Sequence, residues 1–225
     1  MDYILEGLKE GINLLLTFNK EVYGIIFLSL FVSITATIIS SFIFIPLGVY
    51  LGIKDFVGKK IFSRILYTLM SIPSVVVGLI VAIIISRRGP LGSLQLLYTP
   101  WAMIIAQTLL IIPLGLGLTY NLSKNRGKNI EKIGLTLGAG KRDIIILIIS
   151  ELKRDLFINV VTVFSRAISE VGAVMIVGGN IKGHTRVITT SIAMFNSMGN
   201  YPMAIALGLV LLFISFTINS LIYKE

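Results

Sequence analysis

Residues 124–155 read KNRGKNIEKIGLTLGAGKRDIIILIISELKRD and carry twelve charged side chains, eight of them basic. The chain on both sides of this segment is almost free of charge over long distances. A charged segment with its own apolar ridge, held between apolar runs, predicts a helical unit that leaves a membrane and returns to it. We therefore expect the segment to face the cytoplasm and to dock on another protein there.

The composition is that of an integral membrane protein. Hydrophobic residues make up 55% of the 225 positions, charged residues only 14%, and the mean hydropathy is +0.92, which excludes an ordinary soluble domain. The net charge of +9 falls between apolar runs, where basic residues report topology and contact with anionic headgroups of membrane lipid rather than nucleic-acid binding. Because the chain has no cysteine, disulfides and cysteine-ligated metals are excluded.

Uncharged runs longer than the roughly 20 residues that a membrane span needs predict four spans, and a fifth run is apolar except for Arg166 and Glu170. The expected cores are Ile25–Leu51, Ile65–Ile85, Trp101–Leu122, Leu156–Val177 and Met203–Ile222. The predicted fold is therefore an all-α integral membrane protein with five transmembrane helices. It forms one permease-like domain over residues 21–225.

The distribution of lysine and arginine predicts the orientation. With the N-terminus outside, thirteen basic residues lie on the cytoplasmic side, in residues 54–64, in residues 124–155 and in the tail. Six lie outside, and Arg166 lies within the membrane. This excess satisfies the positive-inside rule, so we expect an outer N-terminus, a cytoplasmic C-terminus and a cytoplasmic charged segment.

Residues 1–20 are expected to form a separate amphipathic segment. Apolar residues recur there at helical spacing, at Ile4, Leu5, Leu8, Ile12, Leu15 and Leu16. Acidic residues near the start argue against a cleaved signal peptide. The pattern favours a helix lying in the membrane interface, with an extra span as the alternative.

Three prolines and two pairs of small residues indicate bent, closely packed helices. Pro46, Pro73 and Pro113 fall inside the first three predicted spans, where each proline leaves a backbone carbonyl without its helical partner. Gly48 with Gly52 and Gly78 with Ala82 have the spacing that lets helices approach closely. Ordinary helix packing explains each residue singly, and three bent helices together suit a bundle that moves.

Several catalytic chemistries lack the residues they need. His184 is the sole histidine, too few ligands for a histidine-based metal site or proton relay. The GAGKR stretch at 138–142 resembles a phosphate-binding loop, but Leu135 stands where that loop needs glycine and Arg142 where it needs serine or threonine. A secondary transporter would need repeats or more intramembrane titratable groups, and an enzyme would need clustered nucleophiles or metal ligands. No cofactor or metal is expected.

The charged segment resembles the coupling loop, or EAA loop, of ABC-importer permeases. The matching positions are Lys132, Ile133 and Gly134 for the opening triplet, Gly138 for the loop glycine and Ile148 for a later isoleucine. The departures are Glu131, one place early, and Ser150 and Glu151, where Leu-Pro is usual. The resemblance implies an ATP-binding cassette ATPase as partner. A cytoplasmic amphipathic hairpin without a partner is the alternative.

The residues expected to couple to the ATPase form a small apolar knob with a charged rim, the composition of an interface core and its surround. They are Leu135, Thr136, Leu137, Gly138, Ala139, Gly140, Lys141, Arg142 and Asp143.

A second stretch, SRAISEVGA at 165–173 followed by VGGNIKGHTRVITTSI, is similar to the penultimate span of molybdate and tungstate permeases, most closely the tungstate branch. The translocation-pathway residues this resemblance implies are Ser165, Arg166, Ser169, Glu170 and Gly172. Arg166 and Glu170 are four residues apart, so they share a helix face and can neutralise each other. The pair either fixes helix packing or lines the pathway.

The resemblance implies the permease subunit of an ATP-driven oxyanion importer that works by alternating access. It receives anion from an extracytoplasmic solute-binding protein, with tungstate expected and molybdate or sulfate as alternatives. A single coupling segment without internal duplication predicts a homodimer, because a pair of ATPases needs two docking points.

Overall fold

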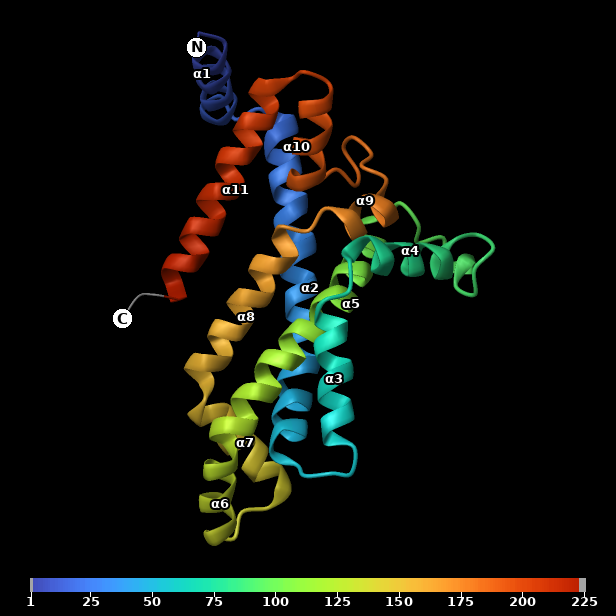
Figure 1. Ribbon diagram of the computed structural model, residues 1–225. Coiled ribbons are helices and arrows are strands. Elements are labelled where there is room, and N and C mark those ends of the chain that lie inside the picture. The colour runs from blue at the N-terminus through green and yellow to red at the C-terminus, as the bar shows by residue number, and fades with distance from the viewer. Residues whose placement is uncertain (1, 223–225) are drawn as a thin grey trace.

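Every regular element in the part of the chain that the structure describes is helical (Figure 1). The computed structural model describes the backbone of residues 2–222 and the side chains of residues 7–220. The α-helices are α1 (Asp2–Leu16), α2 (Lys20–Ile53), α3 (Lys59–Met70), α4 (Ser74–Ile85), α5 (Pro100–Leu122), α6 (Lys128–Thr136), α7 (Lys141–Glu151), α8 (Lys153–Ile168), α9 (Gly172–Gly178), α10 (Ile188–Ser197) and α11 (Tyr201–Ile222). A 3₁₀ turn, η1 (Gly92–Leu94), precedes α5, and a π turn, η2 (Ser123–Gly127), joins α5 to α6.

Three of these helical stretches are long and apolar enough to cross a membrane unbroken: Lys20–Ile53, Pro100–Thr136 and Tyr201–Ser220. Two further spans arise if each of two bent helix pairs counts as one, giving up to five. The length of these helices follows from the sequence, because the backbone of a long apolar run in a membrane can satisfy its hydrogen bonds only within the helix. Pro46 and Pro113 lie inside α2 and α5 without ending them.

The second predicted span, Ile65–Ile85, is not one bent helix as expected but two helices. α3 ends at Met70, α4 begins at Ser74, and their axes differ by 91°. Pro73 sits directly before α4 with φ −59° and ψ 130°, since proline is compatible with a helix start and not with its interior. The fourth predicted span, Leu156–Val177, is likewise broken, between α8 and α9, by 56°.

The long run after residue 187 also differs from expectation. It holds two helices, the short α10 before α11. Asn200 separates them, and its side-chain oxygen accepts a hydrogen bond from the Met203 backbone at 3.3 Å. The core predicted for the last span, Met203–Ile222, lies within α11, whereas α10 was not predicted.

The core is built on α2 and α5, which pack side by side along their length. A Cβ added to Gly48 would lie 2.8 Å from the Thr119 Cβ, and one added to Gly52 would lie 2.6 Å from the Ser123 Cβ. The two glycines therefore let the backbones approach closely, as their spacing predicts. Phe44 and Tyr120 are among the largest fully buried side chains of this contact.

The N-terminal helix α1 packs against α11 through its glycines and through Leu14 and Leu15, which are partly buried against the cluster that includes Ala204 and Leu207. A Cβ added to Gly11 would lie 3.2 Å from backbone atoms of α11. Ile12 and Leu16, in the predicted apolar stripe, are exposed, whereas Ile4 and Leu5 lie outside the residues with described side chains. An interfacial position for residues 1–20 stays a prediction.

Candidate functional site

The charged segment forms a helical hairpin at one end of the bundle (Figure 1). α6 ends at Thr136, four residues turn, and α7 starts at Lys141. Gly138 has φ +81°, a left-handed conformation that glycine adopts readily and other residues adopt at a cost. The glycine singled out by resemblance therefore has a local structural reason, because it reverses the chain between α6 and α7.

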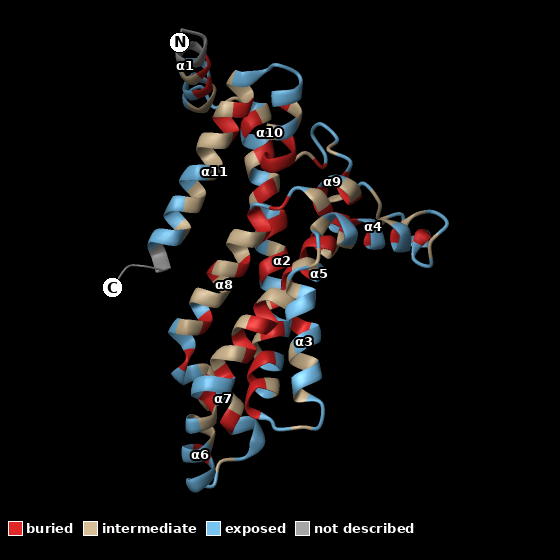
Figure 2. Ribbon diagram, in the orientation of Figure 1, coloured by how far each residue is buried: buried red, intermediate tan, exposed pale blue. Residues whose placement is uncertain are grey.

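The tip of the hairpin exposes apolar side chains. Leu137 is 80% exposed, and Ile133 and Leu135 are more than half exposed. Figure 2 shows this end of the molecule largely in the exposed class. Leu135 and Leu137 are therefore exposed, as a docking knob would need, and Ile133 adds a third exposed apolar side chain beside them. Exposed apolar groups clustered on a polar hairpin are typical of a docking surface.

Other predicted coupling residues serve the hairpin itself. Ala139 is half-buried against the hairpin's apolar cluster. The Asp143 carboxylate accepts a hydrogen bond from the Gly140 backbone at 3.2 Å, so it caps the start of α7. Lys141 and Arg142 are exposed and leave their charge at the rim.

The hairpin is attached to the bundle on its inner side. Ile144 and Ile148 are buried against Val49 and Ile53 of α2. α5, η2 and α6 form one helical stretch over Pro100–Thr136, so the hairpin continues without a break into the helix of the bundle. The isoleucines in this otherwise charged segment therefore bind it to the bundle.

Ion pairs reinforce this attachment. Lys128 lies 2.7 Å and Lys59 3.2 Å from the Asp55 carboxylate, and Arg126 lies 2.6 Å from Asp155. The hydrogen bond from Lys128, followed by that from Lys59, lowers the pKa of Asp55 below its ordinary value. The loop after α2 is thereby tied to both α3 and α6.

The second candidate site is the break between α8 and α9. Arg166 Nη1 donates to Glu170 Oε2 at 2.5 Å, which confirms the predicted ion pair. The two residues do not share a helix face as expected, because α8 ends at Ile168 and Glu170 lies in the break. The two side chains differ in exposure: the Glu170 side chain is 2% exposed, that of Arg166 40%. Glu170 Oε1 also accepts from the Ala173 backbone at 3.1 Å, so the carboxylate caps the start of α9.

Both broken helix pairs meet at this point. A Cβ added to Gly78 of α4 would lie 2.6 Å from the Ala173 Cα, and one added to Gly172 would lie 2.9 Å from the Ser74 hydroxyl. Ser74 also faces the Glu170 carboxylate. Broken helices within a membrane occur where they are buried in protein or line a cavity, which makes this junction the candidate pathway element.

Polar side chains that the sequence analysis did not single out complete the junction. Gln107 of α5 donates to the Ala167 carbonyl at 2.9 Å, and Thr189 of α10 donates to the Glu170 carbonyl at 2.6 Å. The Gln107 carbonyl oxygen is buried without a hydrogen-bond partner among the described residues. The sequence did offer a signal for Gln107, because a glutamine inside an apolar span is uncommon and indicates a polar contact. Nothing in the local sequence indicated Thr189.

The hydroxyls of Ser165 and Ser169 bond back to their own helix, at the Val161 and Ser165 carbonyls. Among the predicted pathway residues, Arg166, Glu170 and Gly172 therefore meet at the junction.

The family follows from comparison with known proteins. Residues 44–223 match the model of the binding-protein-dependent transport system inner membrane component family, a match over most of the chain. The chain belongs to that family. Members of this family are the membrane components of ABC transport systems, which also include an ATPase and a solute-binding protein.

Relatives of this chain are similar over all or most of its length. The chain is 71% identical over 224 residues to the tungstate uptake system permease protein TupB of Peptoclostridium acidaminophilum, covering 100% of this chain and 98% of that protein. It is 37% identical to the protein of that name from Campylobacter jejuni, covering 100% and 94%. It is 26% identical to a sulfate transport system permease protein, CysW, of Synechocystis, covering 84% and 73%.

Proposed function

We propose that this chain is the membrane subunit of an ATP-driven importer that carries tungstate into the cytoplasm. The observation that carries the substrate is the 71% identity over 224 residues with a tungstate uptake permease. Tetrahedral dianions such as tungstate, molybdate and sulfate have similar shapes, so the named relative and not the geometry of the site distinguishes them. The sulfate permease is a far more distant relative.

The exposed tip of the hairpin is the proposed docking point for the ATPase. Leu135 and Leu137 would enter a hollow on that subunit, and the rim of Lys141 and Arg142 would set the register. When ATP closes the ATPase pair, the hairpin moves with it and pulls the continuous stretch Pro100–Thr136. Hydrolysis takes place on the partner, and this chain converts movement into alternating access.

The junction of the broken helices is the proposed element of the pathway. The 40% exposure of Arg166, beside a carboxylate that is 2% exposed, supports an arginine whose head group faces a polar route. Its positive potential would attract an oxyanion, and Glu170 would keep that attraction weak enough for release. The same pair also fixes the start of α9, so the packing role and the pathway role are compatible.

A homodimer is the proposed assembly, with the pathway between two copies and two ATPases beneath them. The single charged hairpin in the described part of the chain supports this assembly, because a pair of ATPases needs two docking points. Leu212, Phe213 and Phe216 of α11 are each about 70% exposed and form an apolar face that a second copy or lipid would cover. We further propose that the hairpin end is cytoplasmic and the N-terminus outside, since the eight basic residues of 124–155 lie at the hairpin end. The C-terminal tail lies outside the described residues.

The deciding experiment measures uptake of tungstate, molybdate and sulfate, by mass spectrometry of cell metal and sulfur content, in cells with and without this gene. Loss of tungstate uptake alone is the expected result. Loss of molybdate or sulfate uptake instead would reassign the substrate within the same transport class. Transport by the purified chain alone in vesicles without ATP would overturn the importer itself.

A further inference from the structure

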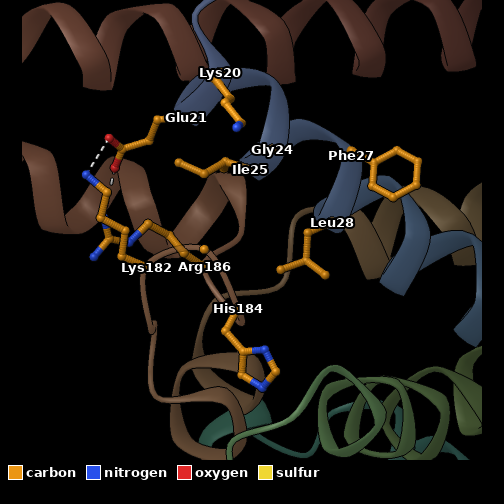
Figure 3. Close-up of a pocket in the computed structure, with 10 residues that line it drawn as sticks. Lys20, Glu21, Gly24, Ile25, Phe27, Leu28, Lys182, His184 and Arg186 are labelled. Atoms are coloured by element: carbon orange, nitrogen blue, oxygen red, sulfur yellow. Dashed lines mark hydrogen bonds and ion pairs between the residues drawn. The ribbon is translucent and has the colours of Figure 1, made fainter.

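A cavity of about 590 Å³ lies at the end of the bundle opposite the hairpin, between the first turns of α2 and the loop 179–187 (Figure 3). This volume is within the range of small-molecule sites. The residues that line it divide into a charged or polar group and an apolar group. They are Lys20, Glu21, Lys182, His184 and Arg186, and Gly24, Ile25, Phe27 and Leu28, with Gly183 in the loop.

Basic side chains outnumber acidic ones around the mouth of this cavity. Lys182 lies 2.7 Å and Arg186 3.2 Å from the two carboxylate oxygens of Glu21. Lys20 adds a third cation and has no ion-pair partner among the described side chains. Three cations around one carboxylate leave the mouth with a net positive charge, so an anionic group is the ligand it favours.

The loop that carries Lys182 and Arg186 is held in place. The Thr185 hydroxyl donates to the Gly178 carbonyl and accepts from the Ile181 backbone at 3.0 Å. The Arg186 guanidinium also lies 5.7 Å from the centre of the Phe195 ring, and its Nε is buried without a hydrogen-bond partner among the described residues. The loop backbone and the Arg186 guanidinium are therefore held in place before an anion binds, which lowers the entropy cost of binding.

The wall below this mouth is apolar and faces outward. Phe27 is 72% exposed, and its ring stacks on that of Phe31, also exposed, one turn further along α2. The uncharged run of α2 begins directly after Glu21, so Phe27 and Leu28 lie within the hydrocarbon region. Lys20 and Leu28 are separated by about 12 Å along the helix axis. A basic mouth above an apolar wall of that length matches a phosphate head group followed by the first part of an acyl chain.

We propose that this cavity binds one anionic phospholipid, with the phosphate at Lys20, Lys182 and Arg186 and an acyl chain along Phe27 and Leu28. A free oxyanion shares the chemistry of the phosphate but has no apolar part, so the exposed aromatic wall would contribute nothing to its binding. The lipid would hold the start of α2 against the loop 179–187, and this proposal is independent of which anion is transported.

The test uses the full-length protein with its ATPase, extracted from nanodiscs that contain equal amounts of phosphatidylglycerol and phosphatidylcholine. Native mass spectrometry then measures which lipid stays bound. We expect retention of phosphatidylglycerol in excess. Lys20→Gln and Lys182→Gln together should lower its apparent affinity roughly fivefold per charge removed, and Arg186 remains to pair with Glu21.

The matched control is the double variant Arg87→Gln and Arg88→Gln, which removes the same charge from exposed residues in the loop after α4. It should retain the lipid as the wild type does. A third variant, Phe27→Gln, separates lipid from free anion: it should weaken phosphatidylglycerol and leave binding of inorganic phosphate unchanged. Equal retention of both lipids by the wild type, or equal loss in test and control variants, would overturn the proposal. Binding of inorganic phosphate that displaces the lipid regardless of Phe27 would do so as well.

Discussion

Gly78 of α4 and Ala173 of α9 lie against each other so closely that a Cβ on Gly78 would stand 2.6 Å from the Ala173 Cα. Each belongs to a different broken helix pair, one broken near Pro73 and the other near Glu170. This contact joins the two breaks into a single junction. The stability of that junction is accordingly sensitive to one methyl group.

Gly78→Ala should therefore destabilise the protein and reduce uptake. The new methyl would meet backbone atoms that cannot rotate away, an overpacking cost of about 1–3 kcal/mol. Thermal unfolding in detergent measures the stability, and anion uptake measures function. Gly208→Ala, in α11 with nothing within 4 Å of the added Cβ, is the control and should be neutral or stabilising. Equal stability of the two variants would show that α4 and α9 do not pack this tightly.

Substitutions of Gly138 and of Leu137 should impair the protein for different reasons. Gly138→Ala faces no steric contact within 4 Å but must adopt φ +81°, at a cost of about 1 kcal/mol. Gly138→Asn should be milder because asparagine tolerates this conformation.

Leu137→Asp should leave membrane insertion and folding intact while abolishing ATPase association, because it places a charge at the proposed interface core. Copurification of the ATPase is the measurement. Wild-type copurification and uptake by Leu137→Asp would place the docking surface elsewhere, whatever the result at Gly138.

The two members of the intramembrane pair should respond unequally. Arg166→Met leaves a carboxylate that is 2% exposed without its cation, whereas Glu170→Gln leaves an arginine that is 40% exposed. Loss of one partner from a buried pair costs about 3–5 kcal/mol, so Arg166→Met should be much the more harmful to folding. Expression level and thermal unfolding provide the comparison.

The double variant Arg166→Met with Glu170→Gln should regain folding, since it leaves no unpaired charge and the amide oxygen can still accept from Ala173. Uptake by this variant decides the role of the pair. A folded double variant that does not transport supports a pathway arginine, and wild-type uptake would restrict the pair to packing.

Asp55 should contribute a pH-dependent attachment of the hairpin. Its pKa is lowered in the folded protein by Lys128 first and Lys59 second. A lowered carboxyl pKa gives stability that is fully present above the unfolded value of about 4 and is lost as the pH falls through the folded value. The difference in unfolding midpoint between wild type and Asp55→Asn should therefore be constant near neutral pH and shrink below about pH 4. Lys128→Gln removes the main cause of the lowered Asp55 pKa, so the loss of the Asp55 contribution should occur at higher pH in this variant. If the loss occurred at the same pH as in the wild type, it would belong to another titrating group.

The sequence by itself determined the class of this protein, the places of its long helices and the hairpin between them. Uncharged runs of sufficient length must form helices in a membrane because their backbone groups have no other partner there. The spacing of Arg166 and Glu170 likewise predicted their ion pair, since the two residues are close in the chain, but the structure places Glu170 in the break after α8 and not on a shared helix face. Gly138 was singled out by its resemblance to the glycine of the coupling loop, and the structure supplies the physical reason, a left-handed conformation at the chain reversal.

Only the tertiary structure decided what these elements meet. The 91° break at Pro73 was not predicted, because proline fixes one backbone angle and does not fix the direction in which the chain continues. The meeting of Gly78 with Ala173, the contact from Thr189 to Glu170, and the cavity between Lys20 and Arg186 each join residues far apart in the chain. Such contacts depend on how whole helices pack against one another, and no local pattern of side chains specifies that arrangement.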